Sequence, residues 1–220
     1  MGIFDVPIYV ELKKKRIAAI VNHFGKEWFD GKRLLELGCG HADMGNEFHL
    51  LGATVTVTDA RKKHLEAVKE KYPYLDRVLY DLNSPEWPFR KDYDLILNMG
   101  ILYHLEKYER FLENCFSSCK NMFLETIVSD SADPAFVKYV DEDGKDEGSD
   151  QSFTSRGCRP SWANIEMLIV ENHFYFQRHF SKDLNTDDNL FDWEPTGSNE
   201  CSRMVDEKFF WLRRAWFCSI

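Results

Sequence analysis

Short apolar runs alternate with helical segments along the first 130 residues, and this alternation constrains the fold more than any other feature of the chain. Each run has the length and composition of a buried strand, and charged amphipathic segments lie between most of them. The predicted strands are 33–37, 54–59, 77–81, 93–98 and 122–128. Strands that alternate with helices form right-handed βαβ units in a parallel sheet with helices on both faces. The sequence therefore predicts an α/β, Rossmann-like fold.

The segments on either side of this alternation add to the same domain. After a short extended opening over 3–10, apolar residues at helical spacing predict an amphipathic helix, so that 1–30 forms a helical cover. Near the other end, a helix is expected from Pro160 to Glu171, and two aromatic runs, 174–180 and 209–217, predict two more strands. We expect seven strands and a single domain over 1–220.

The pattern breaks between residues 129 and 160, where we predict an irregular, lid-like insertion. Long irregular segments in compact domains are usually functional or disordered. The stretch 141–150 holds six acids and one lysine, a net charge of −5. A solvated surface excursion explains this acidic half equally well.

Charge and cysteine content limit the partners and the compartment. The 220 residues carry 28 basic and 37 acidic side chains, a net charge of −9, which argues against a dedicated nucleic-acid binder but leaves room for a local basic face. The six cysteines form no C-x-x-C pair, and we see no secretory segment, so we expect reduced thiols and a cytoplasmic location. No apolar run is long enough to span a membrane. The oligomeric state is not indicated.

The segment LLELGCGHADMG (34–45) carries most of the functional information. A predicted strand runs into Gly38 and Gly40, where the backbone can turn tightly and approach a ligand. Nineteen residues beyond Gly40, the next strand ends in Asp59, an acid placed to accept both hydroxyls of a ribose. Asp43 stands where dinucleotide-binding loops have a small residue, next to the expected phosphates. This disfavours NAD and FAD and favours a nucleoside cofactor with positive charge.

The motifs ELGCG, TDA, DLN and NMGILYHL resemble those of the class I S-adenosylmethionine-dependent methyltransferases over about 33–128. The resemblance implies a seven-stranded, mostly parallel sheet with an antiparallel last strand beside the sixth. It departs from many members at Ala42, where they have a third glycine. S-adenosylmethionine is then the expected cofactor and S-adenosylhomocysteine its product.

The resemblance also implies a set of cofactor contacts. The methionine part and the ribose lie against Glu36, Gly38, Cys39 and Gly40, the ribose hydroxyls against Asp59, the adenine against Ala60, Arg61, Asp81 and Leu82, and the sulfonium against Asn98, Met99 and Gly100. Two of these have plainer interpretations. Asp81 can cap a turn before Pro85, and Cys39 can be a small packing residue.

Methyl transfer needs a general base only if the acceptor must lose a proton. Tyr103 and His104 are the nearest candidates, although a structural histidine fits equally well. Arg156 and Arg159 are expected either to hold an anionic group of the substrate or to pair with the acidic stretch. The histidines and cysteines show no metal-ligand spacing, so no metal is predicted.

These features predict an S-adenosylmethionine-dependent methyltransferase that acts on a small-molecule acceptor by direct SN2 transfer. One alternative is a tRNA-modifying methyl- or carboxymethyltransferase of the wobble-uridine type, because the sequences of 98–105 and 123–126 resemble those of such enzymes. A further alternative is a non-catalytic protein that binds the same cofactor.

Overall fold

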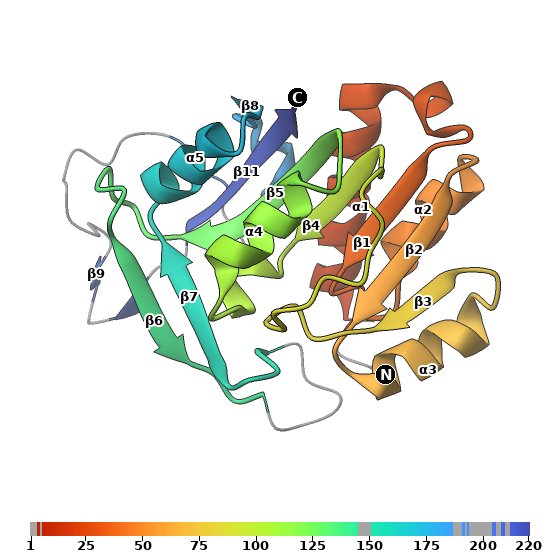
Figure 1. Ribbon diagram of the computed structural model, residues 1–220, viewed down its shortest axis with the longest axis horizontal. Coiled ribbons are helices and arrows are strands. Elements are labelled where there is room, and N and C mark those ends of the chain that lie inside the picture. Colours follow the sequence, from red (N-terminus) through yellow and green to blue (C-terminus); the bar gives the residue numbers. More distant parts are fainter. Residues whose placement is uncertain are drawn as a thin grey trace.

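The computed structural model describes Phe4, residues 6–144 and 151–186, Phe191, Trp193, residues 204–205 and 208–209, and residues 212–220. A seven-stranded sheet with the order β3-β2-β1-β4-β5-β11-β8 forms the centre (Figure 1). Its strands are β1 (Arg33–Leu37), β2 (Thr54–Asp59), β3 (Asp76–Leu79), β4 (Leu95–Met99), β5 (Asn121–Val128), β8 (Tyr175–Arg178) and β11 (Leu212–Ser219). Strands β1 to β5 are parallel, and β11 lies antiparallel to both of its neighbours. The predicted fold class, with an antiparallel last strand beside the sixth, is confirmed.

Helices cover both faces of this sheet. Helices α1 (Pro7–Phe24), α2 (Asp43–Leu50) and α3 (Lys62–Lys71) pack on one face, and α4 (Tyr108–Phe116) and α5 (Trp162–Glu171) pack on the other, in front of the sheet in Figure 1. Alternate strand residues supply the two cores, so that Leu34 packs toward α1–α3 and Leu35 toward α4 and α5. Short 3₁₀ helices are η2 (Lys26–Phe29), η3 (Leu102–His104) and η4 (Lys182–Leu184).

Two predictions at the start and in the middle of the chain need correction. Helix α1 begins at Pro7, so the extended opening expected over 3–10 is wrong at 7–10; proline is well suited to the first helical position because its missing N–H has no partner there anyway. Within 129–160, the structure forms an antiparallel hairpin of β6 (Val137–Asp141) and β7 (Arg156–Pro160). Most of the acidic stretch, 145–150, lies outside the described residues.

The hairpin stands apart from the main sheet and packs against η3 (Figure 1). Strand β7 is buried at Gly157–Pro160, and the Cys158 thiol lies 3.6 Å from the carbonyl oxygen of Leu102. The sequence RGCRP has low β propensity, and its pairing partner is about twenty residues away. Tertiary contacts therefore decide its conformation. A second pair of two-residue strands, β9 (Met204–Val205) and β10 (Lys208–Phe209), follows later in the chain.

None of the helices within the described ranges combines the length with the apolar composition that crossing a bilayer requires.

Candidate active site

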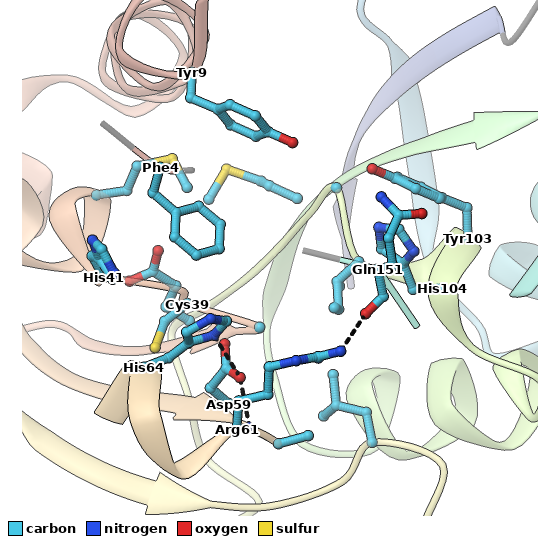
Figure 2. A pocket seen from close by; sticks show the side chains of 18 of the residues that line it. Phe4, Tyr9, Cys39, His41, Asp59, Arg61, His64, Tyr103, His104 and Gln151 are labelled. Carbon is cyan, nitrogen blue, oxygen red and sulfur yellow. Dashed lines mark hydrogen bonds and ion pairs between the residues drawn. The ribbon is translucent and has the colours of Figure 1, made fainter. Parts of the chain in front are cut away.

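The carboxyl ends of β1, β2 and β4 open onto a cavity of about 310 Å³ (Figure 2). One part of its wall, which we call the glycine-loop end, consists of lining residues from 36–44 and 59–64, with Phe4 over them. The other part, the tyrosine end, consists of Tyr103, His104 and Arg213. Helix α1 and the residues after β3 supply the wall between the two ends. In Figure 2, Tyr103 and His104 face the cavity from the side opposite His41 and His64.

The glycine loop requires its glycines. Gly38 and Gly40 have φ of +59° and +53°, in the left-handed region. A Cβ on Gly38 would lie 2.5 Å from Ile101 Cδ1, and one on Gly40 would lie 2.9 Å from the ring of Phe4. Between them, the Cys39 N–H donates to the carbonyl oxygen of Thr58 at 2.9 Å. This hydrogen bond holds the loop against the end of β2, and Gly38 and Cys39 line the cavity.

Asp59 lies at the end of β2 with both carboxylate oxygens held by backbone. Its Oδ2 accepts from the Gly40 N–H at 3.0 Å, and its Oδ1 accepts from the Arg61 N–H at 2.9 Å. His64 Nδ1 is 3.1 Å from the same Oδ1. Asp59, Ala60 and Arg61 all line the cavity, whereas Gly40 acts from behind it through this hydrogen bond. The carboxylate is thus buried and fixed in orientation before any ligand binds.

Glu36 is buried at the base of the glycine loop. Its Oε2 accepts from the Gly45 N–H at 2.9 Å, and its Oε1 has no hydrogen-bond partner among the described residues. Burial raises the pKa of Glu36 to about 8. The side chain lines the cavity, so a cationic ligand group placed there would favour its ionised form.

Asp43 has its negative charge matched within the protein. Its carboxylate contacts Lys13 Nζ, Lys71 Nζ at 2.6 Å and the Tyr72 hydroxyl at 2.9 Å. Burial opposes ionisation, but these hydrogen bonds hold the pKa of Asp43 below its usual range. Asp43 thus links α1, α2 and α3 beside the cavity.

The remaining predicted cofactor residues divide into two groups. Asp81, Leu82, Met99 and Gly100 line the cavity. Asp81 Oδ1 also accepts a hydrogen bond from the Asn83 N–H at 2.9 Å, so this side chain both caps a turn and lines the cavity. Asn98 is not among the lining residues, and its Nδ2 lies 4.0 Å from Met122 Sδ. Because strand residues alternate between faces, Asn98 points into the α4–α5 core while Met99 points to the other side.

The tyrosine end contains a buried ionic cluster that sequence reasoning missed. Glu125 of β5, fully buried, contacts Arg16 of α1 through Oε2 and Arg213 Nη1 of β11 through Oε1, the latter at 2.8 Å. Arg213 Nη2 donates to the Tyr103 hydroxyl at 3.1 Å. Burial raises the pKa of Glu125, but the two guanidiniums outweigh this effect and bring that pKa below its ordinary value. The available signal was charge inside the apolar segments MFLETIV and FFWLRRAWF.

His104 is held by a carboxylate from the hairpin. Its Nδ1 lies 2.5 Å from Glu142 Oε2, and Glu142 also accepts from the Ser152 N–H at 2.8 Å and from Arg159 Nη2 at 3.0 Å. Burial opposes ionisation, yet the contact with His104 lowers the pKa of Glu142. In the neutral tautomer that donates from Nδ1, Nε2 is the basic ring nitrogen. Glu142 had not been singled out from the sequence.

The two arginines proposed for an anionic substrate group lie outside the cavity lining. Arg156 pairs with Glu106 at 3.2 Å and lies over the ring of Tyr139. Arg159 is buried and donates to Glu142 and, at 2.6 Å, to the carbonyl oxygen of Tyr103. Arg159 therefore pairs with an acid of the stretch 141–150, which was the second of the two expectations for these arginines. Arg156 pairs with Glu106, which lies outside that stretch.

Arg61 connects the hairpin to the glycine-loop end. Its guanidinium donates to the carbonyl oxygen of Gln151 at 3.0 Å (Figure 2). It also donates to the carbonyl oxygen of Gly144 at 2.9 Å and lies over the ring of Phe153. Gln151 and Phe153 themselves line the cavity. The hairpin thus closes one side of the site. Within the described part of the chain, no group of three or more potential metal ligands is found.

The chain is similar to known methyltransferases in sequence and in fold. A family described as a methyltransferase domain matches residues 9–184, so the chain belongs to that family. Among solved structures, magnesium protoporphyrin IX methyltransferase from Synechocystis PCC 6803, with bound S-adenosylmethionine, has a TM-score of 0.60 at 13% identity, covering 96% of this chain and 81% of that one. A methyltransferase from Mesorhizobium loti has a TM-score of 0.59 at 15% identity, covering 89% and 98%. The resemblance to class I S-adenosylmethionine-dependent methyltransferases is confirmed.

Curated relatives share part of the chain. The ubiquinone biosynthesis O-methyltransferase of Pelagibacter ubique is 34% identical over 101 residues, 43% of this chain and 42% of the relative. The corresponding enzyme of Chelativorans sp. is 29% identical over 133 residues, 55% of this chain and 51% of the relative. The chain spans about half or less of the length of these relatives.

The burial of Glu36 makes protein stability depend on pH. With a folded pKa of about 8 against an ordinary 4.5, the folded protein holds one more proton than the unfolded chain between these values. Stability from this group is therefore present below about pH 4.5 and falls as pH rises toward 8. Glu36→Gln removes the effect and should stabilise the protein at pH 8 by roughly 3–5 kcal/mol relative to wild type, with little gain at pH 5.

Urea unfolding at pH 5 and pH 8 measures this difference. Glu47→Gln, at an exposed position on α2, the helix whose Gly45 N–H donates to Glu36, is the matched control and should follow wild type at both pH values. Equal stability of Glu36→Gln and wild type at pH 8 would contradict the raised pKa.

Proposed function

We propose that this protein binds S-adenosylmethionine and transfers its methyl group to a small-molecule acceptor. The observation that carries the proposal is one cavity with the glycine loop and Asp59 at one end and the His104–Glu142 pair at the other. Membership of the methyltransferase-domain family supports the activity. The activity of the curated relatives, O-methylation in ubiquinone biosynthesis, supports a small acceptor.

The residues at the glycine-loop end fit this cofactor. Glu36 offers a buried oxygen without a hydrogen-bond partner among the described residues, which suits the cationic amino group of the methionine part. Gly38 and Cys39 line the cavity, so the loop backbone lies against the position of the ribose, and Asp59 can accept its hydroxyls. Glu36 and Asp59 supply carboxyl groups to this part of the cavity, so a positively charged cofactor suits it better than a pyrophosphate.

Bound S-adenosylmethionine supplies a methyl carbon activated by a sulfonium. We propose that His104 is the general base: Nε2 takes the proton of an acceptor hydroxyl, and the oxygen attacks the methyl carbon. In this single SN2 step the carbon–sulfur bond would break as the carbon–oxygen bond forms, its electron pair would stay on sulfur, and S-adenosylhomocysteine would leave. Glu142 acts through His104 as a positioning residue, because it holds Nδ1 and so directs Nε2.

The alternatives have less support. A tRNA-modifying activity would need a surface for a phosphate backbone, and the net charge of −9 argues against one. A non-catalytic binding protein would have no use for a histidine oriented by a buried carboxylate beside the cofactor cavity.

We also propose that residues 1–220 form one domain in the cytoplasm. The sheet combines strands from Arg33 to Ser219, which supports the single domain. The five cysteines in the described part of the chain are buried free thiols, which supports a reducing compartment.

Thermal unfolding with S-adenosylmethionine, S-adenosylhomocysteine and NAD tests the cofactor. A ligand at about 100 times its Kd adds about 2.7 kcal/mol, and each kcal/mol raises Tm by roughly 2–4 °C at this size. We expect an increase of several degrees with the two sulfur nucleosides and none with NAD. An increase with NAD alone would overturn the proposal.

Asp59→Asn should weaken S-adenosylhomocysteine binding by about 10- to 100-fold. Both carboxylate oxygens accept backbone N–H groups, so the amide must place its NH₂ against one of them. Calorimetric titration measures the affinity, and Asp76→Asn, at an exposed position on β3, is the control that should bind like wild type. Unchanged affinity in Asp59→Asn would remove Asp59 from the cofactor site.

Once an acceptor is known, Glu142→Gln should lower kcat by about 10- to 100-fold with KM nearly unchanged. The acidic limb of the pH–rate profile should move to lower pH, because losing the carboxylate makes the imidazole easier to keep neutral. Glu106→Gln is the control. It removes the carboxylate that pairs with Arg156 of the hairpin, both residues lie outside the cavity lining, and the variant should behave like wild type. A rise in KM alone would contradict the positioning role.

A further inference from the structure

His64 is a buried histidine of α3 whose ring nitrogens make no hydrogen bond. The side chain lines the glycine-loop end of the cavity, yet the residue is only 4% exposed. Neither Nδ1 nor Nε2 has a hydrogen-bond partner among the described residues. Buried polar groups without a partner are uncommon in folded proteins, because burying such a group costs stability. An imidazole at this position therefore needs a reason, and the cavity beside it supplies one.

One of the two ring nitrogens lies beside the carboxylate of Asp59 (Figure 2). Nδ1 is 3.1 Å from Asp59 Oδ1, within hydrogen-bonding distance, although the ring is not turned so as to form the bond. The same carboxylate accepts the Gly40 N–H at Oδ2 and the Arg61 N–H at Oδ1. The torsion about the Cβ–Cγ bond of a histidine has a broad energy minimum. Rotation about this bond can direct the Nδ1–H at Oδ1, which adds a third protein donor to the carboxylate.

Aromatic neighbours hold the His64 ring in place. The ring of Phe4 makes an edge contact with it, with centroids 5.1 Å apart and planes at 85°, and the ring of His41 lies 6.1 Å away at 83°. Both neighbours also line the cavity. Because the two ring nitrogens of His64 are buried, the ring meets the cavity through its carbon atoms. His64 therefore acts on a ligand through Asp59 and not by donating to the ligand itself.

We propose that His64 is a positioning residue for cofactor binding: its Nδ1–H donates to Asp59 Oδ1 and holds the carboxylate in the orientation that accepts a ribose hydroxyl. The inference rests on the proposed function and adds the residue that supports its ribose contact. A carboxylate that accepts several protein hydrogen bonds stays ionised and fixed, so less freedom is lost when a hydroxyl binds. With Arg61 and His64 on Oδ1, Oδ2 keeps a lone pair beside the Gly40 bond for that hydroxyl.

Three substitutions in the full chain separate the donor from the space that the ring fills. His64→Leu removes both nitrogens, His64→Asn keeps an amide N–H near the place of Nδ1, and His64→Gln keeps one near the place of Nε2. His49→Leu, at a half-exposed position on α2 outside the cavity lining, is the matched control. Thermal unfolding curves check that each variant is folded. If His64→Leu does not fold, the comparison of His64→Asn with His64→Gln carries the test.

Calorimetric titration compares S-adenosylhomocysteine with its 2′-deoxy and 3′-deoxy analogues. We expect His64→Leu and His64→Gln to bind S-adenosylhomocysteine about 5- to 20-fold more weakly than wild type, and His64→Asn and His49→Leu to bind it within about 3-fold of wild type. His64→Leu should also lose most of the preference of wild type for S-adenosylhomocysteine over the analogue that wild type binds more weakly. A loss by the same factor for all three nucleosides is what a merely structural role produces, and it overturns the inference. Rescue by His64→Gln but not by His64→Asn also overturns it.

A double-mutant cycle with Asp59→Asn shows whether His64 acts through Asp59. If it does, adding His64→Leu to Asp59→Asn should weaken S-adenosylhomocysteine binding by less than about 2-fold, because the contact is already broken. Equal losses with and without Asp59→Asn overturn the inference. The same titrations keep the inference apart from the proposed function. If S-adenosylhomocysteine fails to bind wild type, the proposed function fails; if it binds wild type and His64→Leu equally, only the role of His64 fails.

Discussion

The pairing of two guanidiniums with the buried carboxylate of Glu125 joins the two ends of the chain to the centre of the sheet. Arg16 comes from α1 and Arg213 from β11, and both reach the same β5 side chain on the sheet face that α1 covers. Removing one partner of a buried ion pair typically costs about 3–5 kcal/mol, because the remaining charge stays buried. The cluster therefore fixes α1 and β11 against β5, and the cavity between them depends on it.

The glycine-loop end could be predicted from the sequence because its determinants are local. A strand, two glycines and a following helix stand next to one another in the chain, and Asp59 follows one βα unit later. Parallel strands bring their carboxyl ends to one edge, so spacing along the chain translates directly into proximity. Asn98 shows the limit of this reasoning. Its place in the motif is clear, but strand alternation turns its side chain toward the other face.

The tyrosine end could not be predicted because its contacts join distant positions. Arg16 and Arg213 are 197 positions apart in the numbering, and no local pattern relates either of them to Glu125. The prediction that 129–160 is irregular was wrong for the same reason. The segment RGCRP has weak β propensity and becomes a strand through its pairing with β6 and its burial against η3. Glu142 looked like one acid among six in a solvated stretch, and only the fold places it against His104.

The proposed reaction joins a cationic sulfonium to a deprotonated acceptor oxygen, and charged side chains line the cavity at both ends. Glu36 and Asp59 lie at the glycine-loop end, and Arg213 lies at the tyrosine end. When a deprotonated oxygen attacks a sulfonium methyl, opposite charges cancel as the transition state forms. Water stabilises the separated charges more than that transition state, so a closed cavity favours reaction once fixed protein charges have replaced water in binding the reactants.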